Sequence, residues 1–406
     1  MLDIGGQFRT RWEAQDQFDI RGYAPGAGVQ FVLTRISVDF NFHIGPNTRA
    51  FLELRDARAI GSKLGREDFR RSNPFEDVVD IRQGFVEATK IAGSPIGIKI
   101  GRQQISYGDQ RVFGPGQWGN TGRYAWDAAM LKVETSRLDS EIWVGRFVRN
   151  LPEIWPNRPF AAPTAFVSYN RLKGLPLSLD LFYTLKHESQ ATIHTETGSA
   201  GLHSHSIGVQ AQGTAVRVMD YAGTYVRQFG RFGPYDICAS GLNASTGITF
   251  PLPWSPRLAG QFTRGSGDPY PASGTYGTFD GVFGGADIMF YGYLNLFFWP
   301  NLRDLQADIQ ARPFKSLTLR SEFHHFALDQ ARDAWYSTAG RVQRRDPTGS
   351  SGRYLGKELD VRAIWKANDH LELMGGFGYF RPGRFVGSTG PSANAHWHFL
   401  QAIVSF

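Results

Sequence analysis

The sequence predicts an all-β protein, a transmembrane antiparallel β-barrel of about 16–18 strands, with about 18 favoured. Apolar and polar residues alternate over segments of about ten residues, which is the length that a tilted strand needs to cross a bilayer. The composition also favours strands and turns, since aromatic residues make up 14% of the 406 residues and glycine occurs 47 times. If each strand and its connection take about 20–25 residues, a chain of 406 residues has on the order of 16–18 strands.

The alternation begins in the first segment. Ile4, Phe8 and Trp12 share one face of the expected strand, and Arg9 and Arg11 share the other. A soluble sandwich would turn the charged face to water, whereas a membrane barrel turns the apolar face to lipid and the polar face to the lumen. The length of the segments favours the barrel, because the strands of a sandwich are commonly about 5–6 residues long. The same alternation recurs in segments 32–40, 49–55, 177–186, 304–311, 317–324 and 358–366.

The last segment alternates in the same way and ends in an aromatic residue. Leu400, Ala402, Val404 and Phe406 fall on one face of this expected strand. A terminal phenylalanine after alternating apolar residues resembles the assembly signal of bacterial outer-membrane barrels. We therefore expect these residues to face lipid.

The connections between the expected strands alternate between short and long. The short connections at 173–176 and 367–370 are expected at the periplasmic end, as in bacterial barrels. We expect a single domain over residues 1–406. Its long inward or extracellular loops are predicted near 57–77, 106–122, 149–163, 265–285 and 327–352.

Other classes of protein are disfavoured by what the sequence lacks. It has no run of about 18 apolar residues, so a helical membrane span is not expected. Its one cysteine, Cys238, excludes an intrachain disulfide. No G-x-S-x-G, HExxH, Walker, EF-hand or paired CxxC motif occurs, and we expect neither an enzyme nor a cofactor. The histidine pairs at 203/205, 324/325 and 396/398 are more simply explained as polar lumenal or interfacial side chains, so no catalytic or metal site is predicted.

Charged residues recur on the faces predicted to line the lumen. The chain has 44 Lys and Arg against 37 Asp and Glu, but a formal charge of +7 fits an ordinary basic surface equally well. Guanidinium groups bind carboxylates through paired hydrogen bonds, and rings of Arg or Lys make anion-selective pores. The alternative is a polar lumen in which neighbouring charges neutralise one another. Candidate lining residues on the strands are Arg9, Arg11, Arg35, Arg49, Glu53, Arg55, Arg320, Glu322, Asp360 and Arg362.

The stretch 99–131 is unusual for a connection between strands. It contains Arg102, Asp109, Arg111 and Arg123 among glycines and aromatic residues, whereas short connections usually carry turn residues only. We expect it to fold into the barrel, with these four residues in the pore lining. Strict alternation would place Arg102 on the apolar face, but a β-bulge at Gly101 would return it to the lumen.

This stretch also carries a resemblance to a known family. The segment GRQQISYGDQRVFGPGQWGNTGR, residues 101–123, resembles the signature of the alginate-export family of outer-membrane porins. Residues 278–304 are similar to a later block of that family. The matching positions of the first block are Gly101, Arg102, Gln103, Tyr107, Gly108, Asp109, Gln110, Arg111, Trp118, Asn120, Thr121, Gly122 and Arg123.

The resemblance implies a channel in the outer membrane of a Gram-negative bacterium. Such a channel would pass an anionic polysaccharide or oligosaccharide, most simply an alginate-like uronate, by passive diffusion through an arginine-lined pore. Outer-membrane lipid and periplasmic export or membrane proteins are the expected partners, and nucleic acid is not. The alternative function is a plugged barrel that serves as a scaffold or sheath for a partner protein.

Overall fold

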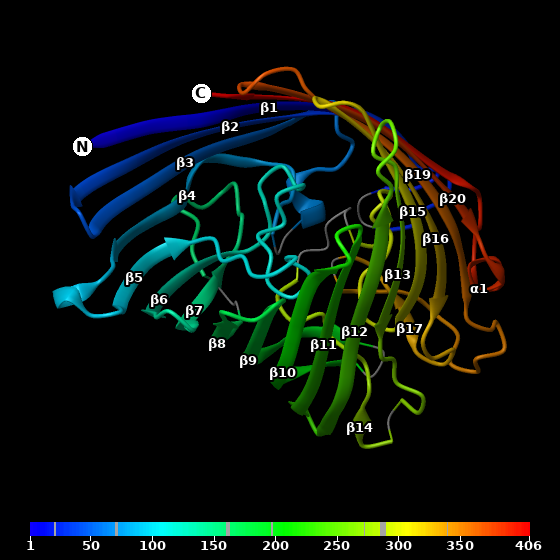
Figure 1. Cartoon of the computed structure of the whole chain (residues 1–406). Coiled ribbons are helices and arrows are strands. Elements are labelled where there is room, and N and C mark those ends of the chain that lie inside the picture. Colours follow the sequence, from blue (N-terminus) through cyan, green and yellow to red (C-terminus); the bar gives the residue numbers. More distant parts are fainter. Residues whose placement is uncertain are drawn as a thin grey trace.

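Antiparallel strands form one closed barrel (Figure 1). The computed structural model describes residues 1–19, 22–69, 72–159, 163–195, 198–271, 273–284, 290–338 and 340–406, without the side chains of 190–195. Within these ranges the wall has 18 strands, which confirms the predicted fold class and strand number. The first and last strands pair from Gln7↔Ser405 to Asp16↔His396, and this pairing closes the barrel.

The wall strands follow one another in chain order around the barrel. They are β1 (Leu2–Asp16), β2 (Gly28–Gly45), β3 (Thr48–Ile60), β4 (Asp77–Ala88), β5 (Ile96–Gln103), β6 (Ala125–Glu134), β7 (Leu138–Val148), β8 (Thr164–Leu172), β9 (Ser178–Thr195), β10 (Gly198–Ala215), β11 (Met219–Phe232), β12 (Tyr235–Thr249), β13 (Arg257–Gly265), β15 (Leu302–Phe314), β16 (Leu317–Leu328), β19 (Tyr354–Lys366), β20 (Leu371–Pro382) and β21 (Ala395–Ser405).

The connections contain short elements of their own. A helix with the length and apolar character needed to cross a membrane is not found among the described residues. The short elements are the 3-10 helices η1 (Arg66–Phe69) and η2 (Ile91–Gly93), the strands β14 (Thr275–Tyr276), β17 (Ala334–Tyr336) and β18 (Val342–Arg345), and the helix α1 (Arg384–Thr389).

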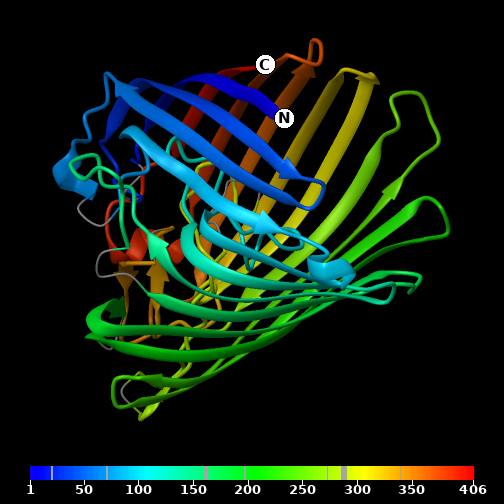
Figure 2. The same cartoon turned by 90° about the vertical axis from the view of Figure 1, so that its left-hand side faces the viewer.

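The two ends of the barrel differ in the length of their connections. The termini lie side by side at one end (Figure 1), where the amide of Gly6 donates to the carbonyl of Phe406. An even number of antiparallel strands brings both termini to the same end, together with short turns such as 46–47 and 315–316. Figure 2 shows the red helix α1 and longer connections at the opposite end. We refer to these as the short-turn end and the long-loop end.

The outer face of the wall is apolar and the inner face is polar. On β19, Leu359 and Val361 are 41% and 46% exposed, whereas Glu358 and Asp360 are buried at 1% and 0%. This is the inverse of a soluble protein, in which the apolar face of a strand would be buried. Leu400, Val404 and Phe406 are exposed in the same way at the end of the chain. The wall therefore presents its hydrophobic face outward, as a lipid-facing barrel requires.

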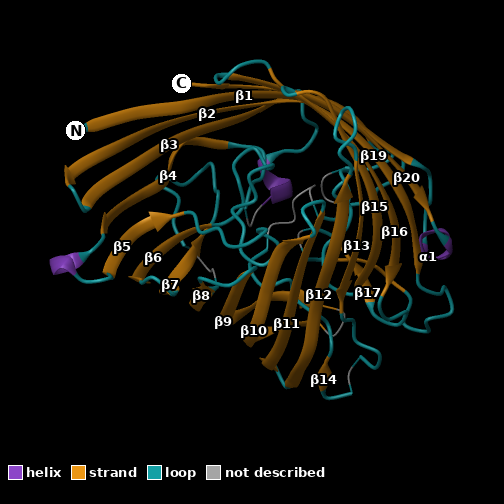
Figure 3. Cartoon of the chain, viewed as in Figure 1, coloured by secondary structure: helices purple, strands orange, loops and turns teal. Residues whose placement is uncertain are grey.

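The lumen is occupied by long connections, which lie inside the ring of strands in Figure 3. The described residues between 290 and 299 are mostly aromatic or aliphatic, and we call this buried run the aromatic segment. It packs on the wall through Phe297, whose ring lies 4.1 Å from that of Phe326 on β16 and 5.4 Å from that of Trp335 on β17. Its buried apolar members are Phe290, Tyr291, Tyr293, Leu294, Leu296, Phe297, Phe298 and Trp299.

The β-bulge predicted at Gly101 is not formed, and this prediction was wrong. β5 pairs with β4 and β6 without a shift in register, so Arg102 keeps the strand face of Ile98 and Ile100. Gly101 has a positive φ of 129°, and a Cβ there would lie 2.3 Å from the carbonyl oxygen of Gly84. The glycine is needed for close approach of β4 and β5 rather than for a bulge.

The carboxylate of Asp329 joins the connection between β13 and β15 to the connection after β16, at the long-loop end. Asp329 follows β16 and accepts bonds from Arg264 on β13 at 2.7 and 2.9 Å and from Arg303 on β15 at 2.7 Å. It also accepts from the amide of Gly267 at 3.2 Å. Burial alone would raise the pKa of Asp329, but the hydrogen bonds from the two guanidinium groups outweigh it and lower this pKa below its ordinary value.

We predict that the loop at 329–353 loosens in acid. Because the folded-state pKa of Asp329 is depressed, its contribution to stability is complete above about pH 4 and is lost as the pH falls through the folded-state value. A nitroxide label at Pro347→Cys, in a Cys238→Ser background, is expected to gain mobility as the pH falls below about 4. Asp329→Asn should give a mobile label at neutral pH with a weaker pH dependence, and identical profiles for the two proteins would contradict the prediction.

We also predict that charge on the middle of the outer face opposes insertion. Val361→Arg is expected to destabilise the folded protein in lipid vesicles by about 2–4 kcal/mol, because the guanidinium would enter the hydrocarbon region. The control Val361→Leu should be close to neutral. Denaturant titrations of vesicle-inserted protein measure both, and an unchanged midpoint for Val361→Arg would exclude Val361 from the lipid.

Candidate functional site

The loop at 104–124 spans the lumen between two sides of the wall. At one side its residues 117–124 contact β1–β4. At the other, Gln210 on β10 donates to Asp109 at 3.3 Å, and Arg111 donates to Gln261 on β13 at 3.1 Å. We call this segment the crossing loop. Its path places residues 104–123 of the motif inside the barrel, while residues 101–103 belong to the wall strand β5.

Arginines of the wall bind the crossing loop through its backbone carbonyls. Arg9 donates to the carbonyls of Gln117 and Gly119 at 3.1 and 3.2 Å. Arg11 and Arg35 donate to those of Trp118 and Gln117 at 2.9 and 3.2 Å. These guanidinium groups therefore satisfy buried carbonyls of a loop that has no strand partner.

The same contact continues along β3 and β4. Arg55 donates to the carbonyl of Thr121 at 3.1 Å, and Arg82 donates to that of Tyr124 at 3.3 Å. Arg55 also pairs with Glu53 at 2.6 Å. Arg82 was not among the predicted lining residues, because the faces of its segment are mixed and the alternation gave no clear inward side.

Asn120 connects the motif to several separate segments. Its Nδ2 donates to the carbonyls of Thr34, Arg58 and Phe75 at 3.0, 3.0 and 2.8 Å. Its Oδ1 accepts from Arg9 at 3.1 Å, and the residue is fully buried. Asn120 thus joins the crossing loop to two wall strands and to the loop before β4.

Arg111 lies at the centre of the packed lumen. It is 3% exposed, and its guanidinium carbon lies 4.7 and 5.4 Å from the ring centroids of Phe290 and Tyr291. Its Nε donates to Asp109 at 3.3 Å. Arg111 therefore joins Asp109 of the crossing loop to the aromatic segment.

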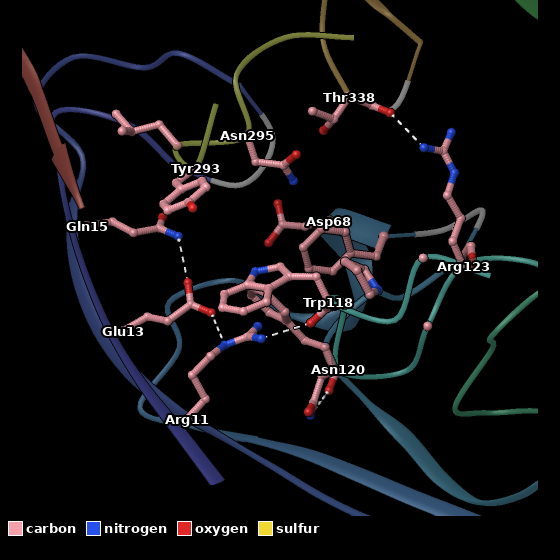
Figure 4. Close-up of a pocket in the computed structure, with 18 of the residues that line it drawn as sticks. Arg11, Glu13, Gln15, Asp68, Trp118, Asn120, Arg123, Tyr293, Asn295 and Thr338 are labelled. Carbon is pink, nitrogen blue, oxygen red and sulfur yellow. Dashed lines mark hydrogen bonds and ion pairs between the residues drawn. The ribbon is translucent and has the colours of Figure 1, made fainter. Parts of the chain in front are cut away.

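A cavity of about 330 Å³ lies beside the crossing loop, toward the long-loop end (Figure 4). Arg11 and Glu13 of β1 form part of its wall, and the Arg11 guanidinium lies 4.0 Å from the ring centroid of Trp118. Arg123 stands at the other side, where it donates to the carbonyl of Thr338 at 3.2 Å. Other lining residues are Gln15, Asp68, Phe69, Asn120, Tyr124, Tyr293, Asn295, Arg341 and Trp397.

This cavity combines the groups that bind acidic sugars. Arg11 and Arg123 supply hydrogen-bond donors with positive charge, while Trp118 and Tyr293 supply flat apolar faces. Glu13 holds Arg11 by a 2.7 Å bond and accepts from the indole of Trp397 at 3.0 Å. The acidic side chain therefore fixes the arrangement and reduces its net charge.

The predicted residues nearer the short-turn end form ion pairs. Arg49 pairs with Glu87 at 2.7 Å, and Glu87 also binds Lys132 at 2.7 Å. Across the barrel, Arg320 pairs with Glu322 at 2.6 Å.

The remaining candidates from the strands contact the aromatic segment. Asp360 accepts the amide of Tyr293 at 3.2 Å, and Glu358 accepts that of Leu294 at 2.9 Å. The Arg362 guanidinium lies 4.9 Å from the Tyr293 ring. Buried charges of β19 thus hold the aromatic segment against the wall.

Arg102 is placed apart from the other motif residues. It lies where the pairing of β4 with β5 ends, and it binds Asp127 of β6 at 2.8 and 3.2 Å. It also donates to the carbonyl of Asn157 at 2.5 Å, and Asn157 binds Asp77 of β4. Arg102 therefore fastens the 149–163 connection to the wall and does not contact the cavity.

Metal binding finds no support in the described part of the chain, where no group of three or more His, Cys, Asp or Glu side chains is arranged to hold an ion. His324 is buried and bonded to Asp304 at 3.0 and 3.1 Å. This pair belongs to the polar inner face.

The architecture defines a porin-like outer-membrane barrel narrowed by inward loops, and the comparisons with known proteins identify its family. A family model described as alginate export matches residues 1–399, and the chain belongs to that family. This assignment makes it an outer-membrane channel protein of a Gram-negative bacterium rather than an enzyme. The comparison with curated proteins found no match.

Solved structures of porins share the fold. OpdL of Pseudomonas aeruginosa is 11% identical with a TM-score of 0.63, covering 100% of this chain and 98% of that chain. OccAB1 of Acinetobacter baumannii is 14% identical with a TM-score of 0.63, covering 100% and 97%. OccK2 (OpdF) of Pseudomonas aeruginosa, solved in complex with glucuronate, is 11% identical with a TM-score of 0.63, covering 100% and 98%.

We predict that Asn120→Ala loosens the crossing loop. The substitution removes the amide group that donates to the carbonyls of Thr34, Arg58 and Phe75, and the expected loss of stability at this contact is on the order of 2–4 kcal/mol. Amide hydrogen exchange in detergent micelles should accelerate at residues 119–122. Gln117→Ala is the control, since its exposed amide lies in the same loop, and equal acceleration in both variants would contradict the prediction.

Proposed function

We propose that the chain is a passive channel for anionic oligosaccharides that contain uronate units, as in alginate. The observation that carries this proposal is the cavity at the crossing loop, where Arg11 and Arg123 face a space also lined by Trp118 and Tyr293. A carboxylate accepts paired bonds from a guanidinium, and aromatic faces pack on the apolar faces of sugar rings. The glucuronate complex of OccK2 supports an acidic sugar as the class of substrate.

The arginine-lined pore is proposed here in a narrower form than the sequence predicted. Arg9, Arg35 and Arg55 donate to crossing-loop carbonyls, and Arg49 and Arg320 pair with carboxylates. These bonds occupy guanidinium donors that would otherwise be available to a passing anion. Arg123 bonds only a carbonyl in the described contacts, so its positive charge is not neutralised by that bond. We assign the main selectivity to Arg123, with a smaller contribution from Arg11 on the opposite side of the cavity.

A plugged scaffold is the second candidate function, and the aromatic segment favours it. The segment is buried against β16 and β19 by apolar packing and by Asp360 and Glu358. A channel requires a path beside this packing or movement of the crossing loop. The cavity favours a channel, because a barrel that served only as a sheath would not need charged and aromatic groups facing an internal space.

We predict that Arg123→Gln weakens block of the channel by uronate. In planar bilayers the wild-type current should prefer anions, and this preference should fall as salt screens the pore charges. The concentration of a uronate trimer that halves the current is expected to rise about tenfold or more, in line with loss of a hydrogen bond to a charged group. Lys315→Gln, in the turn between β15 and β16, removes the same charge outside the lumen and should leave block unchanged.

The same recordings separate the two candidate functions. Anion-selective current that uronate blocks supports the channel. A wild-type barrel without conductance, or one that prefers cations and does not respond to uronate, would overturn the channel and favour the scaffold.

A further inference from the structure

The outer face of β13–β20 changes from apolar to basic near the long-loop end. On β13 and β15, exposed Phe262 and Leu305 are each followed, two residues toward that end, by Arg264 and Arg303. Adjacent outward side chains on a strand are two residues apart, so each arginine lies directly beyond the apolar band.

The neighbouring strands show the same change. On β16 and β19, exposed Phe323 and Leu359 are followed by His325 and Lys357, and on β20 Arg381 occupies the corresponding position. We call Arg264, Arg303, His325, Lys357 and Arg381 the basic rim.

Strand pairing places the members of the basic rim side by side in two groups, because between β15 and β16 Arg303 lies opposite Ala327. Arg264 pairs with Arg303 across β13 and β15. His325 pairs with Lys357, and Lys357 pairs with Arg381, across β16, β19 and β20. Directly opposed residues have Cβ atoms about 4.5–5.5 Å apart, so the positive charges of Arg264 and Arg303, and those of Lys357 and Arg381, repel each other. A row of this kind is destabilising by itself and indicates that an anion reduces the repulsion.

The carboxylates of the protein do not neutralise the positive charge of the basic rim. Asp329 is fully buried and binds Arg264 and Arg303, which leaves that group with a net positive charge. Among the described residues, neither Lys357 nor Arg381 forms an ion pair with a carboxylate. Their exposed side chains lie on the outer face of the barrel, directly beyond the apolar band.

The opposite side of the barrel differs. The outward Arg58 on β3 pairs with Asp56 at 2.7 Å, and Arg102 on β5, whose side chain is only 11% exposed, pairs with Asp127 at 2.8 Å. There the strands supply their own counter-charges. The single-sign surface is therefore a feature of β13–β20 and not of the whole circumference.

We propose that the basic rim binds a phosphate-bearing anionic lipid of the outer leaflet. Its acyl chains lie on the apolar band that includes Leu305, Phe323 and Leu359, and its headgroup phosphates contact Lys357, Arg381 and the Arg264–Arg303 pair. Continuity of the basic rim with the lipid-facing band favours a lipid over a soluble anion, because only a lipid occupies both surfaces at once. The inference is independent of what the channel carries.

The test compares two double variants with equal changes in charge. Lys357→Gln/Arg381→Gln removes two positive charges from the basic rim. Lys315→Gln/Lys366→Gln removes two at the short-turn end of the same part of the wall. Native mass spectrometry of detergent-solubilised protein, titrated with bisphosphorylated lipid A and with zwitterionic phosphatidylcholine, gives the apparent dissociation constants.

The basic-rim variant is expected to bind lipid A at least about tenfold more weakly than wild type, since each cation near a charged headgroup contributes on the order of 1 kcal/mol. The control variant should stay within about twofold, and phosphatidylcholine should bind all proteins alike. Equal weakening in both variants, or no weakening in the basic-rim variant, would overturn the proposal. Displacement of lipid A by inorganic phosphate or by a uronate trimer at equal concentration would reassign the surface to a soluble anion.

Folding is checked by the heat-dependent shift in electrophoretic mobility that intact barrels give. Should the double variant fail this check, Arg381→Gln alone provides the measurement, with Lys366→Gln as its control. The single variant is expected to weaken lipid A binding about fivefold. An unchanged constant for Arg381→Gln would then overturn the proposal.

Discussion

The hydrogen bonds from wall guanidinium groups to backbone carbonyls of the crossing loop determine the shape of the lumen. A loop inside a barrel has no strand to pair with, and its buried carbonyls need donors from elsewhere. Arg9, Arg11, Arg35 and Arg55 provide them from adjacent strands. A guanidinium suits this role because it carries several donors in one plane and can bind more than one carbonyl.

This use of arginine changes how the charges of the lumen should be interpreted. A buried cation is costly unless its donors are satisfied, and carbonyl dipoles satisfy them without adding a full negative charge. The wall from β1 to β3 therefore retains positive charge while most of its donors are occupied. Arg123, which belongs to the crossing loop itself, reaches the cavity because the wall arginines hold its loop in place.

The aromatic segment provides the second constraint. Its amides at Tyr293 and Leu294 are accepted by buried carboxylates of β19, and its rings pack on Phe326 and around Arg111. Apolar packing of this kind is ordinary in a protein interior and unusual for a pore. It makes the lumen a folded core with a cavity beside the crossing loop.

The wall of the barrel can be predicted from local sequence, whereas the lumen depends on packing between distant segments. Alternation with period two reports which face of a strand meets lipid, since neighbouring side chains point to opposite sides. The opposite orientations of Leu359 and Asp360 therefore follow from the sequence alone. The role of Arg55 does not, because its partner Thr121 lies 66 residues away and no local pattern predicts that carbonyl. Arg102 and Arg123 both occupy positions of the family motif. Arg123 lines the cavity, whereas Arg102 binds Asp127 and Asn157. Strand periodicity is a local property of the backbone, but the partner of a charged side chain depends on where distant loops pack.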